Sequence, residues 1–139
     1  MNKVLTMMMA LLMMLLTSCS AEAQTRGRQN EKADAVKVMY FHGKQRCVTC
    51  KAVGKLAREL VAQDYATQAA QGKVQFVEVD FSTPDGERIA DRYEVSSSAL
   101  VLVKGSQADN VTAFAFQHAR SNPESFKRGM KAKIDKMLK

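Results

Sequence analysis

The sequence is short of cysteine and of aromatic residues, and these shortages exclude several kinds of protein. Its 139 residues include three cysteines and no tryptophan. Three cysteines cannot build a framework of several disulfides. Aromatic residues make up 6% of the chain and do not alternate with the basic ones, so no platform for stacking nucleic-acid bases is present. The net charge of +7 therefore indicates a solvated basic surface, and we expect no nucleic-acid partner.

The long apolar run near the N-terminus is shorter than a membrane span. Val4–Leu16 is almost unbroken and follows the positive charge of Lys3, whereas a spanning helix needs about 20 apolar residues. This pattern is typical of a signal peptide. We therefore assign residues 1–18 to a signal peptide, the polar residues 19–34 to a flexible tether and residues 35–139 to one domain.

The end of the apolar run reads Leu16-Thr17-Ser18-Cys19. It resembles the lipobox of bacterial lipoproteins, which implies that Cys19 is lipidated and anchors the protein on the periplasmic side of a bacterial membrane. The alternative is an ordinary signal peptide cut after Ala21-Glu22-Ala23, which would leave a soluble periplasmic protein. Both interpretations predict export.

One cysteine pair is left once Cys19 is set aside, in the motif Cys47-Val48-Thr49-Cys50. A bridge between residues three apart closes too small a loop to stabilise a fold substantially. At the start of a helix the two residues share a face, with Cα atoms about 5 Å apart, inside the range of a disulfide. In an oxidising compartment, such a pair indicates redox chemistry.

The apolar pattern predicts strands that alternate with helices. Strands are expected at 35–41, 74–79, 99–103 and 111–116, and helices from the cysteine motif to a stop at Gly72, at 87–93 and at 123–138. A turn at 105–110 would join the last two strands, and Ser121-Asn122-Pro123-Glu124 matches a capping box. The order β-α-β-α-β-β-α predicts an α/β three-layer sandwich around a mixed four-stranded sheet.

The position of Cys47 at a helix start favours its thiolate. A helix dipole contributes up to about 2 kcal/mol, which lowers a thiol pKa by roughly one unit. Lys44 and Arg46 would add positive charge, unless they are only solvated loop residues. We therefore assign Cys47 as the nucleophile and Cys50 as the resolving cysteine. His42 either packs at the end of the first strand, which is favoured, or transfers protons.

Two other classes of function stay open. The same cysteine pair would supply two ligands to a metal-binding or metal-delivery module, although a closed zinc site needs four ligands. The only histidines are His42 and His118, and nothing in the sequence places His118 near the motif. We expect no resident metal and no separate cofactor. The third hypothesis is an interaction module without turnover.

Over residues 36–138 the chain resembles the thioredoxin superfamily. The resemblance is carried by the first strand, by Cys47-Val48-Thr49-Cys50-Lys51 and by Tyr93-Glu94-Val95-Ser96-Ser97-Ser98-Ala99-Leu100-Val101-Leu102-Val103. It implies a thioredoxin-like sandwich and thiol–disulfide exchange with proteins or small thiols, without a cofactor.

Three positions depart from that family's pattern. Arg46 replaces the tryptophan before the first cysteine, and residues 36–41 lack the family's buried acid. Ala99 stands where the family has a cis-proline, in a loop with Ser98 that faces the cysteines and guides the partner. A cis bond without proline costs about 2.5–4 kcal/mol, so we expect Ser98–Ala99 to be trans or locally strained. Substrate handling is therefore expected to be atypical.

The chain is also similar to a narrower group of short exported thioredoxin-like proteins. The shared stretches are Tyr40-Phe41-His42-Gly43-Lys44-Gln45-Arg46-Cys47-Val48-Thr49-Cys50 and Ala119-Arg120-Ser121-Asn122-Pro123-Glu124. Members of this group are labelled as subunits linked to the reduction of nitrophenyl compounds. The resemblance implies an electron carrier that serves a membrane-bound partner.

Overall fold

The computed structural model describes residues 34–139. The expected signal peptide, Cys19 and all but the last residue of the expected tether lie outside these residues. Within 34–139, no helix combines the length and the apolar character that crossing a membrane requires.

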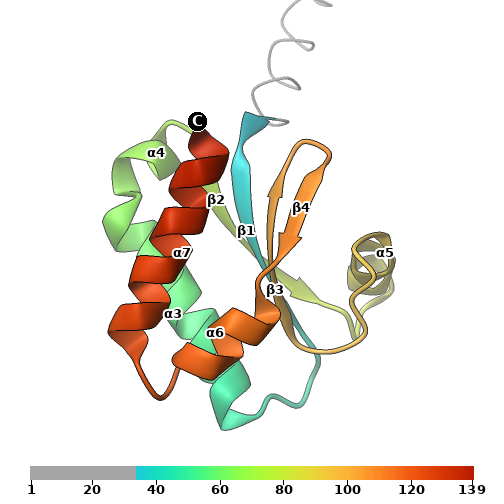
Figure 1. The fold of residues 1–139 in the computed structure, drawn as a ribbon. Coiled ribbons are helices and arrows are strands. Elements are labelled where there is room, and N and C mark those ends of the chain that lie inside the picture. The colour runs from blue at the N-terminus through green and yellow to red at the C-terminus, as the bar shows by residue number, and fades with distance from the viewer. Residues whose placement is uncertain (1–33) are drawn as a thin grey trace, which may run out of the picture. The chain divides into compact units, whose positions relative to one another are not determined.

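The domain is a four-stranded sheet with helices on both faces (Figure 1). The strands are β1 (Val36–His42), β2 (Val74–Asp80), β3 (Ala99–Lys104) and β4 (Gln107–Asn110). The helices are α3 (Val48–Asp64), α4 (Ala66–Ala70), α5 (Pro84–Arg92), α6 (Thr112–His118) and α7 (Pro123–Leu138). The strand order is β2-β1-β3-β4, with β1 and β2 parallel and the other neighbours antiparallel. This is the mixed three-layer sandwich expected from the sequence.

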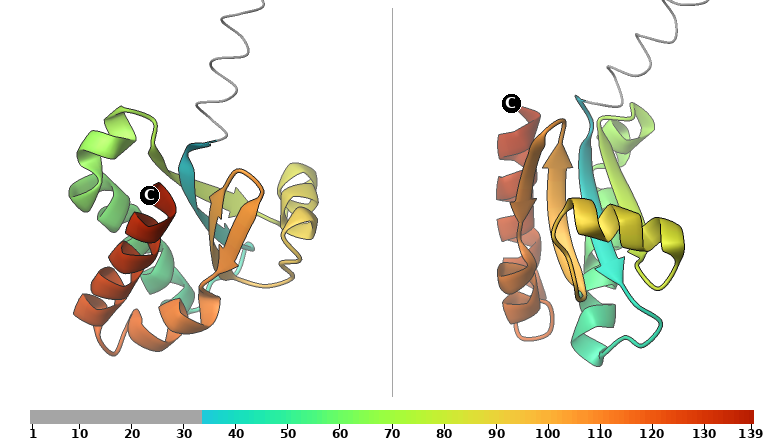
Figure 2. Two further views of the ribbon diagram at one scale, coloured as in Figure 1. Left: turned by 45° about the horizontal axis from the view of Figure 1, so that its top comes forward. Right: turned by 90° about the vertical axis from the view of Figure 1, so that its right-hand side faces the viewer.

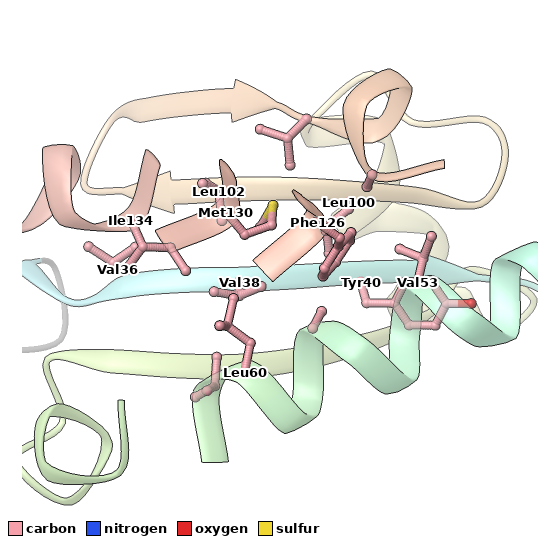
Figure 3. Close-up of a cluster of buried hydrophobic side chains, with 14 of the residues drawn as sticks. Val36, Val38, Tyr40, Val53, Leu60, Leu100, Leu102, Phe126, Met130 and Ile134 are labelled. Carbon is pink, nitrogen blue, oxygen red and sulfur yellow. The ribbon is translucent and has the colours of Figure 1, made fainter. Parts of the chain in front are cut away.

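The central strand β1 is apolar on both faces because both faces are covered by helices. Val36, Val38 and Tyr40 pack in the larger core, which α3, α6 and α7 complete (Figure 3). Met39 and Phe41 point the other way, into a smaller core under α5. Figure 2 shows that α5 covers this second face alone among the described helices. The C-terminal end of β1 is thereby held rigidly at the point where the chain turns into the cysteine motif.

The long helix after the motif is interrupted once before its expected stop. Tyr65 ends α3 with a non-helical backbone, and the short α4 follows. The Tyr65 ring is buried, and its hydroxyl donates to Asp135 Oδ1 at 2.7 Å, which fastens the interruption to α7. Gly72 has a φ of 72° and turns the chain into β2, as the sequence predicts for a glycine helix stop.

The strand expected at 111–116 is wrong, because these residues begin the helix α6. The alternation of apolar residues suggested a strand, but Val111, Ala115 and Ala119 are buried at intervals of four and define a helical face. Asn110 Oδ1 accepts a hydrogen bond from the Thr112 N–H at 3.1 Å at the start of this helix. The fourth strand is instead β4, within the segment expected to be a turn.

The start of one helix and the cap of another also differ from expectation. The helix α5 begins at Pro84, three residues before the expected start at residue 87. The Thr83 hydroxyl caps this earlier start by accepting from the Gly86 N–H at 3.1 Å. The helix α7 is capped by Asn122, not by Ser121 as expected, since Asn122 Oδ1 accepts from the Ser125 N–H at 3.0 Å.

Candidate functional site

The cysteine motif forms the first turn of α3. Cys47 is the N-cap of this helix, and Cys47 and Cys50 are joined by a disulfide with their Cα atoms 5.0 Å apart, close to the distance expected from the sequence. Cys47 Sγ accepts a hydrogen bond from the Cys50 N–H at 3.0 Å. This N–H is one of those that a helix start leaves without a backbone partner, so the same contact would stabilise a Cys47 thiolate after reduction.

The two cysteines differ sharply in exposure. Cys47 is exposed, whereas Cys50 is 8% exposed and belongs to the buried face of α3. A partner's sulfur can therefore approach Cys47 and is screened from Cys50. Val48, between them, is 68% exposed and offers an apolar contact beside the reactive sulfur. This asymmetry fits the assignment of Cys47 as nucleophile and Cys50 as resolving cysteine.

Tyr40 supports the motif from the sheet. Its ring is 1% exposed, and its hydroxyl donates a hydrogen bond to the Cys50 carbonyl at 2.7 Å. Burial raises the pKa of Tyr40 above its usual value, against a smaller lowering by the nearby Arg46. The phenol therefore stays protonated at neutral pH and keeps donating to Cys50.

A glycine in α3 allows the helix to approach this ring. A Cβ atom on Gly54 would lie 2.5 Å from Tyr40 Cε1, closer than real Cβ contacts come. The absence of a side chain at Gly54 therefore sets the distance between α3 and β1. It also sets the position of the cysteines relative to the sheet.

Glu78 is the electrostatic centre behind the motif. It lies beside Tyr40 in the register of β1 and β2. Its Oε1 lies 3.0 Å from His42 Nε2 and 3.0 Å from Arg46 Nη1, and its Oε2 pairs with Arg58. One carboxylate thus holds together the end of β1, the residue before Cys47 and the middle of α3.

The basic residues expected beside Cys47 are placed in different ways. Arg46 is turned toward Glu78, so its charge is largely compensated. Lys44 is exposed and lies near Asp80: the pKa of Asp80 is lowered mainly by hydrogen bonds from Ser82, with smaller contributions from His42 and Lys44. His42 is the last residue of β1 rather than the first of the loop, and it packs there at 6% exposure, as favoured from the sequence.

Ser98 and Ala99 lie where β3 begins, at the end of the sheet from which the chain enters the motif. Ala99 pairs with Phe41, so the start of β3 and the end of β1 meet at the same end of the sheet. No peptide bond among residues 34–139 is cis, and Ser98–Ala99 is accordingly trans, as expected for a position without proline. Whether this loop guides a partner stays a prediction.

His118 lies in α6, with its ring centroid 4.7 Å from that of Phe114. Across the described part of the chain, no group of three or more histidine, cysteine, aspartate or glutamate side chains is arranged to hold a metal ion.

The helix that follows β1 carries the disulfide at its first turn, and the sheet has the order β2-β1-β3-β4 with both faces covered. The chain has a thioredoxin-like fold. The thioredoxin-like core is here extended by α4 after α3 and by α6 between β4 and α7.

The chain is similar to several proteins of known structure. A malarial protein of solved structure is 22% identical at a TM-score of 0.50, over 76% of this chain and 99% of that protein. The oxidised mitochondrial thioredoxin 3 of Saccharomyces cerevisiae is 24% identical at a TM-score of 0.47, over 78% of this chain and 89% of the yeast protein. Trxlp from Edwardsiella tarda is 19% identical at a TM-score of 0.49, over 86% and 96% of the two chains. No protein-family model and no curated protein sequence matches the chain.

Sequence reasoning missed Glu78, Tyr40 and Arg58 as parts of the thioredoxin-like site. The available signal was a carboxylate inside an otherwise mostly apolar strand, which needs a partner when one face of that strand packs on a helix. The partners lie on β1, on the loop after it and on α3, so local sequence pattern alone did not name them.

Proposed function

We propose that this chain is a thiol–disulfide oxidoreductase or electron carrier that exchanges two electrons with a protein partner through Cys47 and Cys50. The supporting observation is the disulfide across the first turn of α3, with one exposed sulfur that accepts a helix N–H and one buried sulfur behind it. In the thioredoxin-like fold this pair follows the C-terminal end of the central strand β1.

The exchange proceeds in two steps when the chain acts as the reductant. The Cys47 thiolate attacks one sulfur of the partner's disulfide, forms a mixed disulfide and releases the other partner sulfur as a thiolate. Cys50 then attacks Cys47 Sγ and breaks the bond between Cys47 Sγ and the partner sulfur. The Cys50 proton goes to one partner thiolate, and water protonates the other. The chain ends with the Cys47–Cys50 disulfide, and the partner ends with two thiols. The oxidising direction is the reverse of these steps.

A redox titration tests this chemistry. We expect the Cys47–Cys50 pair of the purified protein to equilibrate with thiol buffers as a reversible two-electron couple, at a potential between about −270 and −120 mV. The fraction of free thiols, measured by alkylation and mass spectrometry, would follow a single transition. A pair that stays oxidised or reduced across this range would contradict the proposal.

We also propose that the protein is exported and held at the periplasmic side of a membrane by lipid on Cys19. The support is the lipobox-like Leu16-Thr17-Ser18-Cys19 at the end of the apolar run. Labelling cells with a radioactive fatty acid is expected to mark the native protein and not the Cys19→Ser variant. Equal labelling of both would contradict the lipid anchor.

The partner system we propose is one that reduces nitroaryl compounds. The support is the resemblance carried by residues 40–50 and 119–124 to proteins labelled as subunits of such systems. Two electrons per turnover from the dithiol would reach the nitro compound through a membrane-bound partner. The partners trapped by the Cys50→Ser variant, described in the Discussion, test this assignment.

A further inference from the structure

A pocket of about 270 Å³ is lined by residues that include both chain neighbours of the cysteine motif. The residues around it are mostly charged, and its inner wall includes Tyr40 and Gly54. The lining residues are Tyr40, Arg46, Lys51, Gly54, Lys55, Arg58, Glu59 and Glu78. Arg46 immediately precedes Cys47, and Lys51 immediately follows Cys50. A ligand bound in this pocket would therefore contact the residues on either side of the motif.

The pocket carries an excess of positive charge. Its four cationic side chains face two carboxylates, and Glu78 is already paired with Arg46, Arg58 and His42. Lys55 is 74% exposed and meets Glu59 only at 3.8 Å, a contact that contributes little. Among residues 34–139, Lys51 forms no ion pair.

The cations form a row rather than a single point. Lys51, Lys55 and Arg58 are four and three residues apart, so they follow one another along one side of α3. Seven residues of helix rise about 10 Å, which is the length of about three residues of extended chain. The row therefore matches several carboxylates along a peptide better than one isolated small anion.

We propose that this pocket binds an acidic segment that flanks the disulfide of the partner protein. The inference rests on the proposed exchange reaction and specifies its substrate class. Carboxylates of the segment would contact Lys51, Lys55 and Arg58, while the partner's disulfide would lie over Cys47 and its apolar neighbours over Val48. Complementary charge of this kind raises the rate of productive encounter and selects among partners.

Two synthetic disulfide peptides of equal length test the proposal, one with glutamates and one with lysines around its disulfide. The reduced full-length protein is mixed with each peptide at low ionic strength. The rate at which peptide thiol is released gives a second-order rate constant for the reduction. We expect the acidic peptide to react about tenfold faster, because opposite charges steer the encounter. In about 0.5 M salt the two rate constants should converge, since screening is then strong.

Lys51→Glu and Lys55→Glu are each expected to lower the ratio of the two rate constants several-fold. The ratio is used because it cancels any change in thiol reactivity that the variants cause. Lys73→Glu is the matched control: Lys73 is exposed and precedes β2, at the opposite end of the strand from the motif. It changes the net charge equally and is expected to leave the ratio unchanged.

Three results would overturn the proposal, and they differ in what else they overturn. Equal rates for both peptides, or an equal fall of the ratio in Lys73→Glu, would reject the acidic subsite and leave thiol–disulfide exchange intact. Failure to reduce either peptide would reject the exchange reaction itself, and the subsite with it.

Discussion

We expect the Cys47→Ser variant to lose thiol–disulfide exchange by about a thousandfold or more, since removal of a nucleophile removes the reaction path. The variant should still fold. Cys47 caps α3 through its sulfur, and a serine hydroxyl is among the preferred N-caps, so the N–H of residue 50 keeps an acceptor. Two measurements on the same preparation would separate loss of chemistry from loss of fold. They are the rate at which the protein reduces the disulfides of insulin and the midpoint of its unfolding transition.

The Cys50→Ser variant should behave differently. Its exposed Cys47 can still attack, but no resolving thiol remains, so mixed disulfides accumulate. We expect dithiothreitol-sensitive adducts on Cys47 after incubation with oxidised partner peptides, detected by mass spectrometry. The Cys47→Ser variant should form none, because Cys50 is buried. Adducts on Cys50 in that variant would reverse the assigned roles. We expect the proteins that this variant traps in membranes to be components of a nitroaryl-reducing system. Capture of unrelated proteins alone would contradict that assignment.

Gly54→Ala is expected to destabilise the domain by about 1–3 kcal/mol, the usual cost of inserting atoms into a packed core. Helix propensity alone predicts the opposite sign, because alanine is favoured over glycine by about 1 kcal/mol inside a helix. The core cost prevails here because the Tyr40 ring, which the new methyl group meets, is buried and tied to the Cys50 carbonyl. Urea unfolding of the oxidised protein measures the difference.

Gly129→Ala provides the matched comparison on α7. Its new methyl group would meet the Phe114 ring even more closely than that of Gly54→Ala meets Tyr40, but the atom that it meets is the far end of a side chain that is only half-buried. We therefore expect a smaller loss, or a gain from helix propensity. Equal destabilisation by the two substitutions would show that Tyr40 is not the rigid element that its contacts imply.

The sequence predicted well those strands and helices whose apolar residues are the ones that become buried. The strands β1 and β3 are buried almost throughout, and the helices α3 and α7 present buried residues at helical spacing. The misplaced region is the one in which two patterns overlap. Residues 111–116 alternate like a strand and also carry the four-residue spacing of α6. The strand β4 is polar, and its conformation comes from hydrogen bonds to β3 that no local pattern records.

For the reactive site, too, one part could be predicted from the sequence and another part could not. Three-residue spacing at a helix start predicts the Cys47–Cys50 pair, its separation and its contact with a helix N–H, because all three are local geometry. The surroundings depend on the register of β1 against β2, which places Glu78 beside Tyr40. That register arises from contacts between segments more than 30 residues apart. The Arg46 side chain turns toward Glu78, so its orientation could not be predicted without knowing where Glu78 lies.

The strand β4 closes one edge of the sheet, and its composition affects how the protein behaves at high concentration. An edge strand offers unpaired N–H and C=O groups to any other chain, and long apolar edges promote aggregation. This one has four residues, is largely exposed and carries Asp109, which pairs with Lys133 on α7. The polarity that hid β4 from sequence analysis therefore also guards this edge against strand addition by other chains.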